Sequence, residues 1–305
     1  MRIFLTFFFI FILNLNKVMD IVIKSKFAGL ILALSIIVFG LESSYSILLF
    51  LVVMLSIGIP HGSVDHIIAF INPEARKFSN RLTFYIIYIS LILLNILVWI
   101  ISPFIGLFVF LIISCYHFGE TQVIGYNSTN NKLLNFVVGA NILLSLFLNN
   151  IVELQGILYI IPEFSSLDLS NFDSVFFLLI SVAVLMLSIV NFKIKRKVPL
   201  YAEITILYMV FFHTDLLTSF ALYFGFCHSL PMLMLEFKAF KSESFVKFYI
   251  KTLPFTIISL IFGFVLYQFN NDLLTSDNLI LFVFIVISSL TVPHVFIMKD
   301  FVKDK

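Results

Sequence analysis

The sequence has very little charge. Only 12% of its 305 residues are Asp, Glu, Lys or Arg, whereas 61% are hydrophobic; ordinary globular domains have about 25% charged residues. So apolar a chain is neither a water-soluble domain nor an intrinsically disordered one, and a net charge of +2 supplies no basic face for nucleic acid. The class that remains is an integral membrane protein.

Glycine, proline and cysteine are also scarce. The 11 Gly and 8 Pro fit long membrane-spanning helices with a few breaks better than the alternating strands of a barrel. Cys115 and Cys227 lie in separate apolar stretches, so we expect buried free thiols and no disulfide. The expected fold is an all-α, polytopic transmembrane helical bundle.

Apolar segments of membrane-spanning length make up most of the chain. A helix needs roughly 20 residues to cross a bilayer, and about ten candidate spans are present. They lie near 27–41, 46–66, 82–101, 103–120, 133–149, 174–192, 200–213, 216–236, 254–269 and 279–298. We therefore expect one transmembrane domain over 27–301, preceded by an N-terminal hydrophobic segment over 1–26 in which the start is either Met1 or Met19.

The basic residues predict how the bundle is oriented. If the residues before 27 are cytoplasmic and ten spans alternate, every Lys and Arg except Arg2 falls on the cytoplasmic side, and the outer loops carry only acidic charges. Lys and Arg collect in cytoplasmic loops of membrane proteins. The sequence thus predicts a multi-pass protein of the cell (inner) membrane with both ends in the cytoplasm.

Five of the six histidines lie at one depth in this topology. His61 and His66 end the second span, His117 ends the fourth, His228 lies late in the eighth, and His294 ends the tenth. These spans run in the same direction, so the five histidines lie together toward the cytoplasmic side. Ionisable residues inside a membrane mark functional sites, and imidazole binds Zn, Cu, Fe and Ni. The cluster predicts a metal centre without identifying the metal.

Two acidic residues accompany the histidines. Asp65 follows His61 by four residues and Glu120 follows His117 by three, so either carboxylate is placed to accept a ring N–H and orient a metal ligand. Prolines also lie close to the histidines, and proline opens a helix where the backbone lines a cavity. They are Pro60, Pro231 and Pro293.

Four motifs occur in order along the chain: GIPHGSVDH, YHFGE, FALYFGFCHSLP and LTVPHVFIMKDF. They resemble the Brp/Blh family, the membrane-bound beta-carotene 15,15'-dioxygenases, over about residues 46–301. The resemblance implies an Fe(II)-dependent enzyme that uses O2 to split the central 15,15' double bond of beta-carotene into two molecules of retinal. By motif, it implies that His61, His117 and His228 bind the iron.

The fourth ligand position departs from the family. Family members have a second histidine four residues after the third ligand, and here that position is Met232. A thioether suits Cu(I) better than Fe(II). Either His66 or His294 completes the set, or the iron keeps an open position, or the chain is a divergent member with altered chemistry. No catalytic side chain beyond the metal site is predicted.

A carotenoid is a rod-like hydrocarbon that dissolves in the bilayer. An enzyme acting on it is expected to open sideways to lipid through an apolar tunnel. Aromatic residues beside the histidines are candidates for its lining: Tyr116, Phe118, Phe224, Phe226 and Phe296. Tyr116 or Tyr223 is a candidate to hydrogen-bond an oxygen species. The expected partners are the carotenoid, O2, the lipid bilayer and, as product acceptor, a retinal-binding rhodopsin.

Two other functions fit the sequence. One is a zinc-dependent intramembrane lipid hydrolase, in which Asp65 or Glu120 activates a metal-bound water. The other is a non-catalytic membrane protein, for example a transporter whose histidines relay protons or carry a metal ion. Met232 keeps this last alternative open, because an incomplete ligand set is compatible with lost catalysis.

Overall fold

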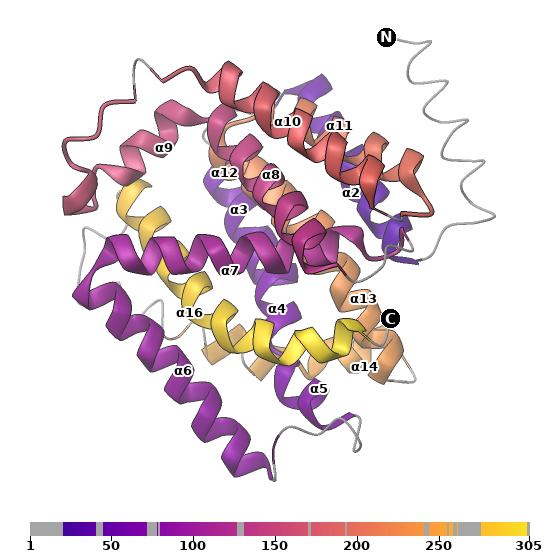
Figure 1. The fold of residues 1–305 in the computed structure, drawn as a ribbon. Helices are drawn as coiled ribbons and strands as arrows, with labels where there is room; N and C mark the ends of the chain where they lie inside the picture. Colours follow the sequence, from indigo (N-terminus) through magenta and orange to yellow (C-terminus); the bar gives the residue numbers. More distant parts are fainter. Residues whose placement is uncertain are drawn as a thin grey trace.

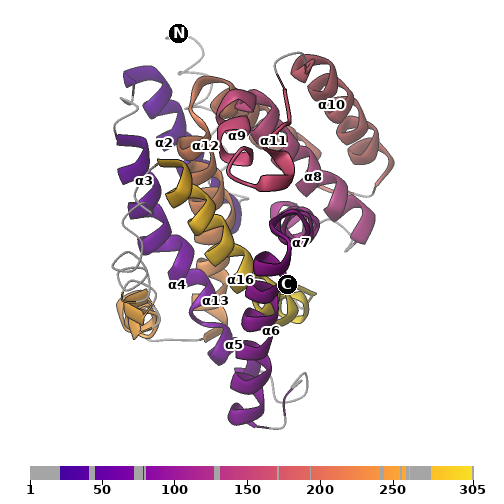
Figure 2. The same ribbon diagram turned by 90° about the vertical axis from the view of Figure 1, so that its left-hand side faces the viewer.

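The chain folds as a bundle of helices (Figures 1 and 2). The computed structural model describes residues 21–40, 45–71, 78, 80–126, 131–169, 172–192, 194–240, 244–254, 256–258, 261 and 276–303. Of the expected N-terminal segment over 1–26, the part before residue 21, with both candidate starts, lies outside the described residues.

The described helices follow one another along the chain. In order they are α2 (Ile21–Phe39), α3 (Ser46–Val53), η2 (Met54–Gly58), α4 (Ile59–Gly62), α5 (Asp65–Ile71), α6 (Arg81–Ile101), α7 (Pro103–Val123), α8 (Lys132–Asn149), α9 (Ile151–Leu158), η3 (Pro162–Phe164), α10 (Ser174–Asn191), α11 (Lys197–His213), α12 (Leu216–Ala221), η4 (Leu222–Ser229), α13 (Leu230–Phe240), α14 (Phe245–Ile250) and α16 (Ser276–Lys303). This order confirms the all-α, polytopic fold that the composition predicts.

Eight helices of the described part are long and apolar enough to cross a membrane. They are Ile21–Phe39, Ser46–Phe70, Arg81–Ile101, Pro103–Val123, Lys132–Asn149, Ser174–Asn191, Leu216–Phe240 and Leu281–Lys299. The span expected near 200–213 corresponds to α11, which has 17 residues. Most of the span expected near 254–269 lies outside the described residues. The count of ten therefore stays a prediction, as does the placement of both ends in the cytoplasm.

Lys26 differs from the expectation. The topology places it in a cytoplasmic loop, whereas α2 is already helical from Ile21 and Lys26 is fully buried within it. Its Nζ donates to the backbone oxygen of Gln122 at 2.6 Å and lies 3.7 Å from the Glu203 carboxylate. Burial, with Glu203 beside it, raises the pKa of Tyr126 well above its usual value, so its hydroxyl stays protonated and donates to Glu203. The buried ammonium is thus paired with a carboxylate.

Glycines allow the central helices to approach closely. A Cβ on Gly119 of α7 would lie 1.6 Å from the backbone oxygen of Asn135 on α8, and a Cβ on Gly139 would lie 1.8 Å from that of Cys115. Small residues at such crossings are common between membrane helices. The last helix, α16, crosses α6, α7 and the α4–α5 segment (Figure 1). This crossing places the last helix, α16, against the second candidate span, Ser46–Phe70.

Candidate metal centre

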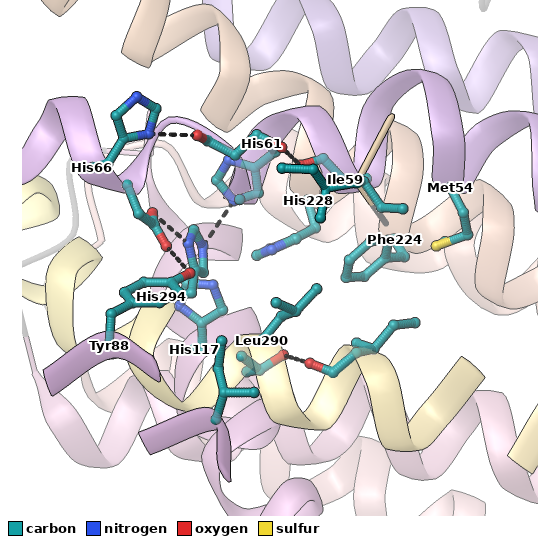
Figure 3. A pocket seen from close by; sticks show the side chains of 18 of the residues that line it. Met54, Ile59, His61, His66, Tyr88, His117, Phe224, His228, Leu290 and His294 are labelled. Carbon is teal, nitrogen blue, oxygen red and sulfur yellow. Dashed lines mark hydrogen bonds and ion pairs between the residues drawn. The ribbon is translucent and has the colours of Figure 1, made fainter. Parts of the chain in front are cut away.

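Histidines from four separate helical segments meet inside the bundle. His61 on α4, His117 on α7 and His228 in η4 are buried, and one ring nitrogen from each lies within 4.8 Å of the others. His294 of α16 faces the same space (Figure 3). Its ring centroid is 4.6 Å from that of His61 and 5.1 Å from that of His117. The structure therefore brings together four of the histidines that the topology places at one level.

The helix that carries His61 is widened before it reaches that residue. Pro60 has no N–H to bond the carbonyl of Ser56, four residues earlier, and the chain forms the π-helical segment η2 at this point. The freed carbonyl accepts a hydrogen bond from the Tyr249 hydroxyl at 2.8 Å. His228 also lies in a π-helical segment, η4. Such segments are rare and occur mostly at functional sites.

The two π-helical segments pack directly on one another because each has a glycine three residues before its histidine. A Cβ on Gly58 would lie 2.9 Å from Cε1 of Phe224, and a Cβ on Gly225 would lie 2.2 Å from Cγ1 of Val53. The absence of these Cβ atoms lets the backbones approach. This close packing of the two segments brings the rings of His61 and His228 to a centroid separation of 5.4 Å.

A threonine determines which nitrogen of His228 carries the proton. The hydroxyl of Thr121 has one proton, and the backbone oxygens of His117 and Phe118 accept it at 3.1 and 3.0 Å. The Thr121 oxygen therefore accepts from Nδ1 of His228, 2.8 Å away. This leaves the lone pair of His228 Nε2 available to a cation.

A carboxylate determines the tautomer of His294 in the same way. Nδ1 of His294 lies 2.8 Å from Oδ1 of Asp65, and the other oxygen of Asp65 accepts from the Tyr88 hydroxyl at 2.8 Å. An ionised carboxylate only accepts hydrogen bonds, so Nδ1 carries the proton and Nε2 presents a lone pair. That Nε2 lies 3.1 Å from Nε2 of His61. Oε1 of Glu236 lies 2.7 Å from Nδ1 of His61 on the opposite side of the ring.

These ring nitrogens fit a cation. With carboxylate oxygens beside the Nδ1 atoms of His61 and His294, their Nε2 lone pairs face each other, an arrangement that a shared positive ion stabilises. Within the described residues neither ring nitrogen of buried His117 has a hydrogen-bond partner, and buried polar groups are normally satisfied. Four imidazoles without a thiolate are donors that iron and zinc both accept.

The other residues considered from the sequence lie elsewhere. His66 lines the cavity but points away from the cluster, with its Nδ1 2.9 Å from the backbone oxygen of Ser63 (Figure 3). Met232 is fully buried in an apolar cluster and does not line the cavity. Glu120 is buried and accepts from the Tyr116 hydroxyl at 3.0 Å, on its own helix.

Thr121, Tyr88 and Glu236 belong to the site but are not predicted from the sequence. Glu236 carried a usable signal, because it is an acidic residue at the end of an expected span, and intramembrane carboxylates are functional candidates by default. Tyr88 and Thr121 gave no such signal. Their polar groups matter only because other helices bring Asp65 and His228 beside them.

A cavity of about 370 Å³ adjoins the histidines and is mostly apolar. The cluster lies at one side of it, and the space continues along Phe224, Met54 and Leu290 (Figure 3). Its lining also includes Ile89 and Ile258, which are 53% and 60% exposed, so the cavity reaches the outer surface beside α6.

Only part of the expected aromatic lining is found. Phe118 and Phe224 line the cavity, whereas Tyr116, Phe226 and Phe296 are not among its lining residues. Phe226 instead packs on Gly29 of α2, and Phe296 is 45% exposed. Tyr223 is fully buried but does not line the cavity either, so the candidates for a hydroxyl near an oxygen species are not placed for that role.

Comparison with known proteins agrees with this geometry. Residues 52–301 match the family model described as "Beta-carotene 15,15'-dioxygenase". A relative named beta-carotene 15,15'-dioxygenase, from uncultured marine bacterium 66A03, is 27% identical over 261 residues, which cover 83% of this chain and 92% of that protein. No solved structure matches the chain. Because the family model covers His61, His117, His228 and His294 and most of the helical bundle, the chain belongs to the beta-carotene 15,15'-dioxygenase family.

Proposed function

We propose that this protein cleaves the central 15,15' double bond of beta-carotene with O2 to give two molecules of retinal, at an Fe(II) held by His61, His117, His228 and His294. One observation carries the proposal: four buried imidazoles from separate helices converge at the wall of an apolar cavity. Iron, when bound, supplies the capacity to activate O2. The family membership supports the choice of substrate.

The chain's own residues bind the substrate and exclude water. The cavity wall is almost entirely hydrocarbon, which suits a polyene and keeps water from the reacting carbons. Phe118 and Phe224 lie beside the His228 ring, with ring centroids 4.8 and 5.3 Å from it, and both line the cavity that would hold the flat conjugated chain. The opening beside α6 offers a path from the bilayer, so the substrate need not cross water.

His294 takes the place of the family's fourth ligand in this proposal. Met232 has its side chain in an apolar cluster and away from the cavity, whereas Nε2 of His294 lies 3.1 Å from Nε2 of His61. The zinc hydrolase is less well supported, because Asp65 is already bonded to His294 and Tyr88. Glu120 does not line the cavity. Neither carboxylate is placed to activate a water on a substrate.

Location and partners follow from the orientation that the basic residues predict. In the cell (inner) membrane, the histidine cluster would lie toward the cytoplasmic side, and retinal released beside α6 would enter the bilayer. A retinal-binding rhodopsin in the same membrane is the product acceptor that we propose.

The test is co-expression in a bacterium that makes beta-carotene. We expect loss of the orange colour and appearance of retinal by chromatography. His61→Ala, His117→Ala, His228→Ala and His294→Ala should each keep the colour. Exposed His213, at the end of α11, provides a matched control, and His213→Ala should remain active.

Persistence of colour with the unaltered chain would refute the cleavage reaction. Metal analysis of the purified protein separates the alternatives, since stoichiometric zinc without iron would favour hydrolysis. An active His294→Ala variant with full iron content would remove His294 from the ligand set.

A further inference from the structure

Glu236 has a position that neither the reaction nor the family motif assigns. It lies on α13 one helical turn after Met232, is 1% exposed, and places Oε1 2.7 Å from Nδ1 of His61. Within the described residues neither of its carboxylate oxygens has a hydrogen bond. A carboxylate in this state is costly inside a membrane protein unless a charge compensates it.

The contact resembles the one between Asp65 and His294, although only the Asp65 contact has hydrogen-bond geometry. In both cases a buried carboxylate lies beside Nδ1 of a ring, at 2.8 Å in one and 2.7 Å in the other. The two rings then present their Nε2 atoms to each other at 3.1 Å. Carboxylates in this position fix the tautomer and direction of metal-binding histidines.

The charges also balance. When Asp65 and Glu236 are both ionised they carry two negative charges, and the four imidazoles are neutral when they bind a metal. A divalent cation held by the histidines would then make the buried cluster neutral overall. A site with Asp65 alone would keep a net positive charge in a low-dielectric interior, which is unfavourable.

We infer that Glu236 is a positioning residue: it holds the Nδ1 side of His61, directs Nε2 toward the metal, and supplies the second negative charge that makes the site suit a divalent cation. Helix α13, which carries the fourth histidine in family members, thus contributes the carboxylate of Glu236 to the site here, and Met232 contributes nothing to it. This inference rests on the proposed metal centre and does not depend on which reaction occurs there.

The test measures metal binding without any turnover. The purified full-length apoprotein in detergent is titrated with Co²⁺, and the visible absorption of the bound ion reports both affinity and ligand field. Glu236→Gln keeps the size of the side chain but removes its charge. We expect an affinity about 10- to 100-fold lower, which is the usual loss when such a partner is removed, and a shifted Co²⁺ spectrum.

Glu203 provides the matched control. It is a glutamate with 0% exposure, but its carboxylate contacts Lys26 and Tyr126 and no histidine ring. Glu203→Gln should bind Co²⁺ with unchanged affinity and an unchanged spectrum, even where its thermal stability falls. Glu236→Asp, which keeps the charge and withdraws it by one methylene, should recover part of the affinity that Glu236→Gln loses.

Wild-type affinity and spectrum in both Glu236 variants would overturn the inference. An equal loss in Glu203→Gln would also overturn it, because the effect would then follow from removing any buried carboxylate. If Glu236→Gln does not fold, the aspartate variant decides alone, since an unchanged spectrum there contradicts the role. Failure of the wild-type protein to bind Co²⁺ refutes the metal centre itself, whereas Co²⁺ binding without carotenoid cleavage refutes only the proposed reaction.

Discussion

The hydroxyl of Tyr88 offers a sharp test of how the site is held, because its removal leaves every histidine in place. Tyr88 donates to Oδ2 of Asp65 at 2.8 Å, and Oδ1 of the same carboxylate lies 2.8 Å from Nδ1 of His294. A hydrogen bond to a charged group contributes about 1.5–3 kcal/mol. Since about 1.4 kcal/mol corresponds to a factor of ten, Tyr88→Phe should weaken metal binding by about tenfold to about 100-fold at most. The remaining bond from His294 keeps Asp65 in place, so the loss should not be complete.

The assay is the iron affinity of the purified protein, followed by carotenoid turnover at saturating iron. Tyr85 is the matched control: it lies one turn earlier on α6 and lines the same cavity, and within the described residues its hydroxyl has no hydrogen bond. Tyr85→Phe should leave iron affinity unchanged. If the two variants lose iron affinity equally, or if Tyr88→Phe loses none, the hydrogen bonds from Tyr88 to Asp65 and from His294 to Asp65 do not orient the ligand. A change in KM alone would instead indicate a contact with the substrate.

Three further perturbations follow from the packing. Met232→His should not strengthen iron binding, because its side chain lies in an apolar cluster and would bury an imidazole at a cost of about 1–3 kcal/mol; an increase in iron content would contradict the structure. Gly119→Ala should prevent stable folding, since the new Cβ would lie 1.6 Å from the backbone oxygen of Asn135, and a monodisperse, thermally stable variant in detergent would show that α7 and α8 do not cross there. Lys26→Met should destabilise by about 3–5 kcal/mol because it leaves Glu203 buried without its cation, whereas the double variant with Glu203→Gln should be less destabilised. Equal melting temperatures for the single and double variants would indicate that the pair is not coupled.

The helices could be predicted closely because their signal is local. The expected spans near 82–101 and 133–149 correspond to Arg81–Ile101 and Lys132–Asn149, since a continuous apolar run needs no tertiary information to be recognised. Lys26 shows where this reasoning fails. The pattern of basic residues places Lys26 in a loop, but Glu203, distant in the sequence, makes its burial in α2 tolerable.

The site could be predicted as a set of residues but not as an arrangement. The shared depth of His61, His117, His228 and His294 follows from their positions at the ends of parallel spans, which hydropathy and the basic residues define. The partner of Asp65 did not follow in the same way. Its spacing points to its own helix neighbour His61, whereas the structure pairs it with His294, 229 residues away.

The sequence by itself determined that this chain is a membrane protein and in which order its helices run, and it places five of its six histidines at a common level. These properties depend on composition and on the position of residues within one span, so a stretch of consecutive residues is enough to predict them. Only the tertiary structure decided that His294 and not Met232 faces the other histidines, and that Glu236 reaches His61. The rotation and crossing of each helix depend on contacts between distant segments, such as Gly225 against Val53. A local sequence pattern does not predict such contacts.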